Sequence, residues 1–366
     1  MIPLCIPEVR GNEWKYVKEC IDTNWVSSVG SYVNLFEEKF AEYLEAKKAI
    51  VTMNGTAAIQ LALVTLGIGE GDEVIVPSMT FISPVNAIKY VGASPVFCDV
   101  RKDTFVMDEE KIEELITERT KAIMPVHIYG HPVDMDKVMD LAKKYNLSVI
   151  EDATEALGSE YKEKMLGTIG DMGCFSFNGN KLITTGAGGM LVTNEEKLGD
   201  RAKFLSNQTK VVLENKAFYH PEVGYNFRMP NLLAAFGVAQ LEQVEEYLKV
   251  KRENAFYYND QLKGVKGITL PLEKSWAKNC FWLYSILVEE DYPISRDELI
   301  KKLGESKIEA RPFFMPVHDM PPYKECKAGD MSITNEVAAK GINLPSSVSL
   351  TKEQIDTICD IIKNVK

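Results

Sequence analysis

The chain has 366 residues, of which 45% are hydrophobic and 26% charged, and its formal net charge is −11 at pH 7. This composition is typical of a globular protein long enough for two or three domains. The acidic balance argues against nucleic acid or an anionic membrane as the main partner, because both bind basic surfaces. No apolar run reaches the roughly 18 residues of a membrane span.

The cysteines and histidines indicate neither a disulfide scaffold nor a metal site. The seven cysteines are scattered and form no CxxC pair, which favours free thiols in a reducing compartment. The four histidines show no zinc-binding spacing such as HExxH, so we expect no metal. Residues 1–6 lack the basic lead and the long apolar stretch of a signal peptide. We therefore expect a cytoplasmic protein.

Short apolar runs alternate with helical patterns over the first half of the chain. The predicted strands are 49–53, 73–77, 94–98, 122–126, 148–150, 173–177 and 190–193, and the predicted helices include 57–66, 107–117 and 135–145. This alternation predicts an α/β domain with a large, mostly parallel sheet and helices on both faces. Ligands of such sheets bind at the carboxyl ends of the strands.

The pattern changes after residue 230. Residues 231–262 have the apolar spacing of one long helix, and 280–288 resemble a strand. Capping boxes at Ser295 and Thr351 predict two further helix starts. We expect a large domain of residues 21–245 and a smaller α+β domain made of 1–20 and 246–366.

Polar residues follow the first two predicted strands. Asn54-Gly55-Thr56 lies between a strand and a helix, where unpaired amides and the helix dipole favour a phosphate. An ordinary strand-to-helix turn is the alternative. Phe81 follows the second strand and is suited to stacking on a flat ring, although a core position would also explain it.

An acidic pair and a lysine follow two later strands. Asp152 and Glu155 follow a buried run, where an acid needs a partner. A salt bridge or a helix cap would also account for Asp152, and an exposed loop is the default for Lys181. The order of phosphate turn, aromatic ring, acid and lysine, each at a strand end, favours a pyridoxal phosphate site.

A dinucleotide site is the competing hypothesis for an α/β sheet. The glycines of 67–71 come after a helix and before a strand. The dinucleotide fingerprint requires the reverse order. We therefore interpret this segment as a helix stop followed by a turn.

Six segments carry a family resemblance, and they are residues 54–58, 76–81, 125–130, 150–153, 175–181 and 186–190. Over nearly its whole length the chain resembles the fold-type I, aspartate aminotransferase-like enzymes that aminate nucleotide sugars, the DegT/StrS family. Residues 25–30, 179–181 and 311–323 resemble members that act on GDP-linked sugars. Deoxygenating relatives have histidine where this chain has Lys181, so the resemblance implies transamination.

The resemblance also implies roles for individual residues. Lys181 would form the Schiff base with the cofactor and move the substrate proton, Asp152 would pair with the ring nitrogen, and Glu155 would lie near the cofactor and the sugar. The residues implied in cofactor binding are Gly55, Thr56, Phe81, Asp152, Ser176, Lys181 and Asn226, and those implied in substrate binding are Ser28, Arg311 and His318. Asn226 would reach the cofactor of a neighbouring subunit, which implies a homodimer with shared active sites.

The reaction implied is transfer of the amino group of L-glutamate to C4 of a nucleotide-linked 4-keto-6-deoxyhexose. The mannose-series GDP sugar is the main hypothesis, and the product would serve cell-surface polysaccharide. The same reaction on a UDP-4-keto-6-deoxy-N-acetylhexosamine is the nearest alternative. A non-catalytic, pyridoxal phosphate-binding regulator and a dinucleotide-dependent oxidoreductase are remoter alternatives.

Overall fold

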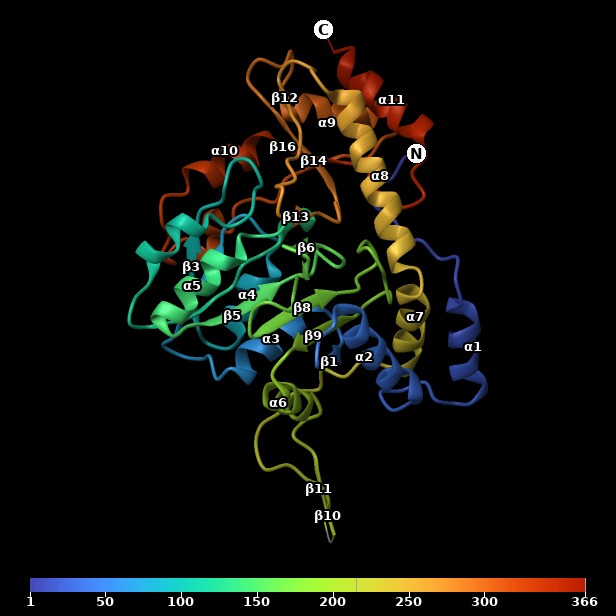
Figure 1. The fold of residues 1–366 in the computed structure, drawn as a ribbon, viewed down its shortest axis with the longest axis vertical. Coiled ribbons are helices and arrows are strands. Elements are labelled where there is room, and N and C mark those ends of the chain that lie inside the picture. The colour runs from blue at the N-terminus through green and yellow to red at the C-terminus, as the bar shows by residue number, and fades with distance from the viewer. Residues whose placement is uncertain (215, 366) are drawn as a thin grey trace.

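The computed structural model describes residues 1–214 and 216–365, and two sheets with separate cores organise this part of the chain (Figure 1). In the larger sheet the strand order is β1-β9-β8-β5-β4-β2-β3. Its strands are β1 (Lys48–Thr52), β2 (Glu73–Pro77), β3 (Ser94–Cys98), β4 (Thr120–Ile123), β5 (Ser148–Asp152), β8 (Met172–Ser176) and β9 (Gly189–Thr193). Only β9 runs antiparallel to both neighbours among these described strands, so the predicted mostly parallel sheet is confirmed.

The strands of the larger sheet are buried because helices cover them. Strands β2 and β9 are buried along their whole length, as the apolar runs predicted for a two-sided parallel sheet. The helices of this half are α1 (Glu13–Asp22), α2 (Ser31–Leu44), α3 (Gly55–Thr65), α4 (Ser83–Tyr90), α5 (Met135–Tyr145), α6 (Glu196–Ser206) and α7 (Asn231–Leu241). Helix α3 packs on β8 and β9, and α5 packs on β5.

The predicted helix 107–117 is wrong. The segment forms two 3₁₀ helices, η1 (Glu109–Lys111) and η2 (Glu113–Leu115). The carboxylate of Asp108 accepts the Glu110 N–H, and the backbone returns to an extended conformation at Ile116. Local side-chain bonds to the backbone therefore replace the α-helix that the spacing of apolar residues suggested.

The second sheet has the strand order β12-β14-β16-β15. The helices and strands of this half of the chain are α8 (Val244–Leu262), β12 (Ile268–Thr269), β14 (Tyr284–Val288), α9 (Arg296–Glu305), β15 (Arg311–Pro312), α10 (Ser332–Lys340), β16 (Gly341–Leu344) and α11 (Lys352–Lys363). Both predicted capping boxes are present, at Ser295 for α9 and at Thr351 for α11. Apolar side chains of α8, α9 and α11 pack with β14 and β16 in a separate core.

The predicted single helix 231–262 is two helices. Helix α7 ends at Leu241 and α8 begins at Val244, so the interruption falls at Glu242 and Gln243. The carboxylate of Glu242 accepts hydrogen bonds from Asn12 (2.7 Å) and Tyr16 (2.6 Å), which tie this junction to the N-terminal region. Figure 1 shows α8 extending from α7 toward the smaller sheet.

Short elements complete the described chain. They are β6 (Glu160–Tyr161), β7 (Lys164–Met165), β13 (Ala277–Lys278), β10 (Val211–Leu213), β11 (Lys216–Tyr219), η3 (Ile128–Gly130), η4 (Val317–Asp319) and η5 (Pro321–Tyr323). Strand β13 pairs with β6, so the second half of the chain adds a strand beside the first half. The β10–β11 hairpin projects away from the body of the molecule (Figure 1).

The N-terminal segment runs along the smaller sheet before α1 packs against α7. The Ile2 N–H donates to the Lys307 carbonyl at 2.8 Å, and the Ser346 N–H donates to the Leu4 carbonyl at 2.7 Å. The division at residues 21 and 245 stays a prediction. Within residues 1–214 and 216–365, none of the helices has the length and apolar character needed to span a bilayer.

Candidate active site

The main candidate site is a cavity of about 390 Å³ beside the carboxyl ends of β5 and β8 and the start of α3. Its lining includes these predicted residues: Gly55, Thr56, Phe81, Asp152, Glu155, Ser176, Lys181 and Arg311. The strand ends bring these positions together although they are far apart in the sequence. Parallel strands explain this convergence, because their carboxyl ends meet at one edge of the sheet.

Lys181 lies in the turn that follows β8, and its side chain is only 13% exposed. Its Nζ lies 3.5 Å from Oε1 of Glu155 and 3.7 Å from the ring centroid of Trp282. The default of an exposed loop lysine is therefore wrong for this residue. A partly desolvated amine next to a carboxylate and an aromatic face is suited to bonding a carbonyl carbon and to moving a proton.

Asp152 is the last residue of β5 and is fully inside the protein. Its N–H donates to the Pro125 carbonyl (2.9 Å), and its carboxylate accepts the Thr154 N–H (3.1 Å). Burial raises the pKa of Asp152, while the charge of Lys181 acts in the opposite direction. A buried carboxylate at the wall of a cavity is suited to a cationic N–H donor.

Glu155 follows β5, and the backbone amide of a residue after a neighbouring strand holds its carboxylate. Its Oε2 accepts the Tyr129 N–H at 2.8 Å, and its Oε1 is the atom that faces Lys181. Tyr129 has a φ of 54°, a left-handed conformation that is uncommon for residues other than glycine. Burial raises the pKa of Glu155, and the Lys181 charge opposes that rise.

The start of α3 forms another wall of the cavity. Asn54 caps this helix, because its side chain accepts the Ala57 N–H at 2.8 Å. Gly55 approaches Ser176 so closely that a Cβ atom at Gly55 would lie 2.9 Å from the Ser176 Cβ. The Thr56 hydroxyl donates to Ser83 at 2.9 Å. The glycine thus allows the first helical turn, with its free amides, to come close to β8.

Phe81 and Arg311 lie on the open side of the cavity. Phe81 is 54% exposed, and its ring centroid is 5.9 Å from that of Phe314. The core alternative for Phe81 is therefore wrong. The Arg311 guanidinium donates to the Glu309 carboxylate at 3.0 Å through Nε. Both residues line the cavity, so both can contact a bound molecule.

Three predicted residues do not line this cavity. Ser28 lines a separate cavity of about 190 Å³ together with Arg228. Asn226 is exposed, and its side-chain oxygen accepts a hydrogen bond from Arg228 at 3.3 Å. His318 is bonded through Nδ1 to the Ser78 hydroxyl at 2.6 Å, behind the strand end. The structure of this single chain does not bring these residues to Lys181.

A buried network beneath Asp152 was not predicted. Both oxygens of Glu151 accept backbone N–H groups, from Ile169 (2.7 Å) and Gly170 (2.7 Å) on one oxygen and from Gly167 (2.8 Å) on the other. His127 Nε2 also bonds this carboxylate at 3.1 Å, while the His127 Nδ1 accepts the Val133 N–H. An acidic residue in a buried strand, Glu151, indicates that it has buried partners, but those partners lie in the turn of residues 167–170, which the sequence does not link to it.

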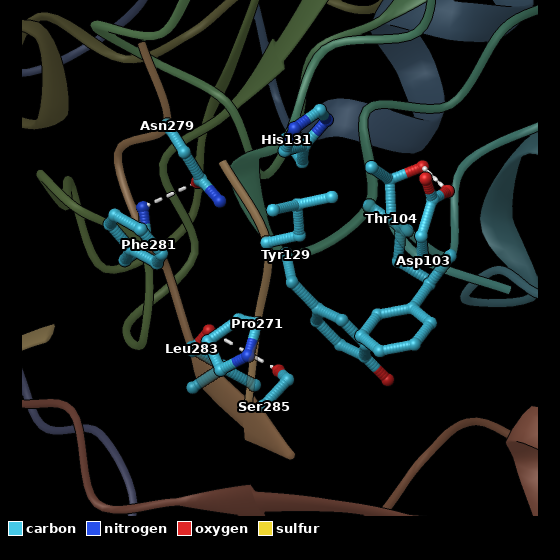
Figure 2. A pocket seen from close by; sticks show the side chains of 12 residues that line it. Asp103, Thr104, Tyr129, His131, Pro271, Asn279, Phe281, Leu283 and Ser285 are labelled. Atoms are coloured by element: carbon cyan, nitrogen blue, oxygen red, sulfur yellow. Dashed lines mark hydrogen bonds between the residues drawn. The ribbon is translucent and has the colours of Figure 1, made fainter. Parts of the chain in front are cut away.

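A second, smaller cavity has a volume of about 20 Å³ and is lined by residues from both halves of the chain (Figure 2). Tyr129, His131, Asn279 and Ser285 line it, and burial lowers the pKa of His131 to about 4. The His131 Nδ1–H donates to the Pro132 carbonyl at 2.8 Å and Nε2 accepts the Lys274 N–H at 3.3 Å, which fixes the tautomer of the neutral ring. A space of this size holds about one water molecule, which indicates packing rather than a substrate site.

The main cavity fits pyridoxal phosphate by the chemistry of its walls. A lysine, a buried carboxylate with a raised pKa and a helix start lie around one space that also has an aromatic ring at its opening. The close approach at Gly55 leaves no room for a side chain, which is the condition for backbone amides to contact a phosphate.

The comparisons agree with this geometry. The model of the DegT/DnrJ/EryC1/StrS aminotransferase family matches residues 7–363. The GDP-perosamine synthase of Escherichia coli O157:H7 is 47% identical over 99% of this chain and 97% of its own length. That of Caulobacter vibrioides is 44% identical over 100% of this chain and 98% of its own. The solved aminotransferase TlmJ of Streptoalloteichus hindustanus superposes with a TM-score of 0.93 at 27% identity, covering 99% of this chain and 98% of that one.

The chain belongs to the DegT/DnrJ/EryC1/StrS aminotransferase family. A relative in Bacillus subtilis, EpsN, is 36% identical over 99% of this chain and 96% of its own length, and its name describes a pyridoxal phosphate-dependent aminotransferase. The predicted fold class, the aminotransferase class and the pyridoxal phosphate cofactor are thereby confirmed.

Proposed function

We propose that the chain transfers the amino group of L-glutamate to C4 of GDP-4-keto-6-deoxymannose, which gives GDP-perosamine and 2-oxoglutarate. The observation that carries this proposal is the convergence of Lys181, Asp152 and Glu155 on one cavity in a chain with full-length similarity to GDP-perosamine synthases. The product is a precursor for cell-surface polysaccharide.

The three residues have distinct roles in this proposal. The cofactor supplies a ring that withdraws electrons from the substrate carbon. Lys181 bonds the cofactor and carries the substrate proton at Nζ. Asp152 keeps a proton on the ring nitrogen, because its carboxylate is buried at the cavity wall. Glu155 orients the Lys181 amino group from 3.5 Å.

The remaining predicted residues would bind and orient. The amides at Gly55 and Thr56 and the hydroxyl of Ser176 lie where a phosphate would meet the start of α3. Phe81 is open to the cavity and would lie against the cofactor ring. Arg311 would contact an anionic part of the substrate, since its guanidinium lines the same space.

We also propose a homodimer, in which Asn226 of one subunit completes the cofactor site of the other. Asn226 is exposed and lies outside its own chain's cavity. Large apolar side chains on and after the β10–β11 hairpin are also exposed, namely Val212, Phe218 and Val223. Exposed apolar side chains of this size are suited to burial against a second copy. Ser28 and His318 stay proposed substrate contacts. The free thiols of the described cysteines support a cytoplasmic location.

A paired assay tests the proposed substrate. Pyridoxal phosphate-loaded protein and L-glutamate are incubated with GDP-4-keto-6-deoxymannose or with UDP-4-keto-6-deoxy-N-acetylglucosamine, and the 4-amino sugar is measured. We expect product from the GDP sugar alone, and none with Lys181→Ala. Product from the UDP sugar alone would show that the substrate is an N-acetylated UDP sugar. Product from neither sugar would refute the proposal.

A further inference from the structure

Trp282 contacts the Lys181 side chain and the backbone carbonyl just before it, although none of the predicted roles includes the tryptophan. The tryptophan precedes β14, is buried and lines the main cavity. Its Nε1–H donates to the carbonyl of Asn180 at 2.7 Å, which fixes the backbone immediately before the lysine. Its ring centroid lies 3.7 Å from the Lys181 Nζ, which places the ammonium against the indole face.

These two contacts restrain the flexible lysine side chain. A lysine has four methylene groups between its backbone and its charge, and it loses considerable rotamer freedom when it is ordered. The indole face attracts the ammonium electrostatically, and the attraction is larger where water is excluded. Because Glu155 lies 3.5 Å from the same nitrogen, the amine is held between a carboxylate and a π face.

Trp282 is itself held in place by buried contacts. The ammonium of Lys251 donates to the Trp282 carbonyl at 2.8 Å and to the Ser346 carbonyl at 2.5 Å, and Lys251 is buried. The ring of Tyr129 is stacked with the indole, with 6.4 Å between centroids and 23° between planes. Tyr129 also donates its N–H to Glu155, so the two groups that face Lys181 share one support.

We propose that Trp282 is a positioning residue for the amino transfer. It holds the Lys181 amino group beside Glu155 whenever that group is not bonded to the cofactor. This inference rests on the proposed aminotransferase function of the site. The alternative is a core tryptophan that only fills space, and such a residue would not control where the lysine nitrogen lies.

The test compares Trp282→Leu and Trp282→Phe in the loaded enzyme. Trp276→Leu is the control, because Trp276 is a half-buried tryptophan that packs on His131 and Tyr161 and not on Lys181. Thermal unfolding of each variant measures any general loss of packing. L-Glutamate without a sugar substrate is then added, which frees Lys181 from the cofactor.

The first readout is the position of the lysine, not the activity. In protein labelled with ¹³C at the lysine ε-carbons, the Lys181 signal is assigned with Lys181→Arg. After glutamate is added to the wild-type enzyme, the indole ring current should move this signal upfield. The shift should be smaller in Trp282→Phe and absent in Trp282→Leu. The same Lys181 signal in Trp282→Leu as in the wild type would overturn the proposal.

The second readout is the rate of the glutamate half-reaction, followed by the loss of cofactor absorbance. We expect a fall of about thirtyfold in Trp282→Leu, the size of a desolvated cation–π contact, with little change in the glutamate concentration at half-saturation. The isotope effect with 2-deuterated glutamate should rise, because proton transfer becomes slower. Rates within twofold of wild type would overturn the proposal. If the wild type completes this half-reaction but aminates neither sugar, the proposed function fails while the Trp282 result stands.

Discussion

The Oε1 atom of Glu155 lies 3.5 Å from the Nζ of Lys181, and both side chains are largely buried. The other oxygen of Glu155 accepts the Tyr129 N–H at 2.8 Å, so the carboxylate cannot turn freely. A fixed charge next to a reacting amine contributes most when little water screens it. The pair therefore sets the position and the charge environment of the amine.

Glu155→Gln should slow the glutamate half-reaction by roughly ten- to a hundredfold, because an amide keeps the shape but loses a charged hydrogen-bond partner. The Tyr129 N–H still finds an acceptor in glutamine, so the variant should fold normally. Stopped-flow absorbance of the loaded enzyme measures the rate. Glu118→Gln, at an exposed position, is the control and should match the wild type. Equal rates in both variants would remove Glu155 from this role.

Asp152→Asn should separate stability from catalysis. Because burial raises the pKa of Asp152, the folded cofactor-free protein binds this proton more tightly than the unfolded chain does. The free energy of unfolding therefore falls as the pH rises from about 3.9, the unfolded pKa, through the raised folded pKa.

In the cofactor-free protein, Asp152→Asn should flatten this pH dependence and add about 1 kcal/mol of stability at pH 7. The loaded variant should nevertheless lose most of its amino-transfer rate. Urea unfolding at several pH values and the glutamate half-reaction measure the two effects. A variant with a near-wild-type rate would show that Asp152 does not hold the ring nitrogen.

Glu151→Gln should destabilise the protein by roughly 3 kcal/mol. Each oxygen of Glu151 accepts N–H groups, so either orientation of the amide would direct its NH₂ at buried donors. Urea unfolding measures the change, with Glu118→Gln as the exposed control. A loss below about 0.5 kcal/mol, the usual range for surface changes, would mean that this network does not support the end of β5.

Subunit hybrids test whether active sites are shared. Lys181→Ala and Asn226→Ala should each be strongly impaired as homodimers. A hybrid purified through two different tags has one site with both native residues, so it should recover about half of the wild-type activity. A hybrid no more active than its parents would show that Asn226 acts within its own chain or not at all.

The strands were predictable because a sheet covered on both faces needs continuous apolar runs, as in β2 and β3. Helix α5 was predicted with its observed bounds, 135–145, because its apolar residues recur at helical spacing and form one buried face opposite a polar one. The segment 107–117 was not, since the Asp108 carboxylate bonds the backbone locally. Because Asp152, Glu155 and Lys181 lie at or after strand ends, the sequence predicted that they would meet at one edge of the sheet.

Other parts of the site depend on contacts that sequence spacing does not encode. Trp282 reaches Lys181 only after the two sheets come together, and the Tyr129 N–H reaches Glu155 from the turn after a neighbouring strand of the larger sheet. The amides that surround Glu151 come from a turn around Gly167 whose partner cannot be read from its own residues. Asn226 was implied by family resemblance alone, and its role depends on a second chain.

Reductive trapping tests the central claim, that Lys181 bonds the cofactor, most directly. The loaded wild-type protein is treated with borohydride, digested and analysed by peptide mass spectrometry. We expect one reduced pyridoxyl phosphate group, located on Lys181, and its loss when L-glutamate is added before the borohydride. A label on another lysine, or a label on Lys181 that glutamate does not remove, would contradict the assignment of Lys181 as the cofactor-binding lysine.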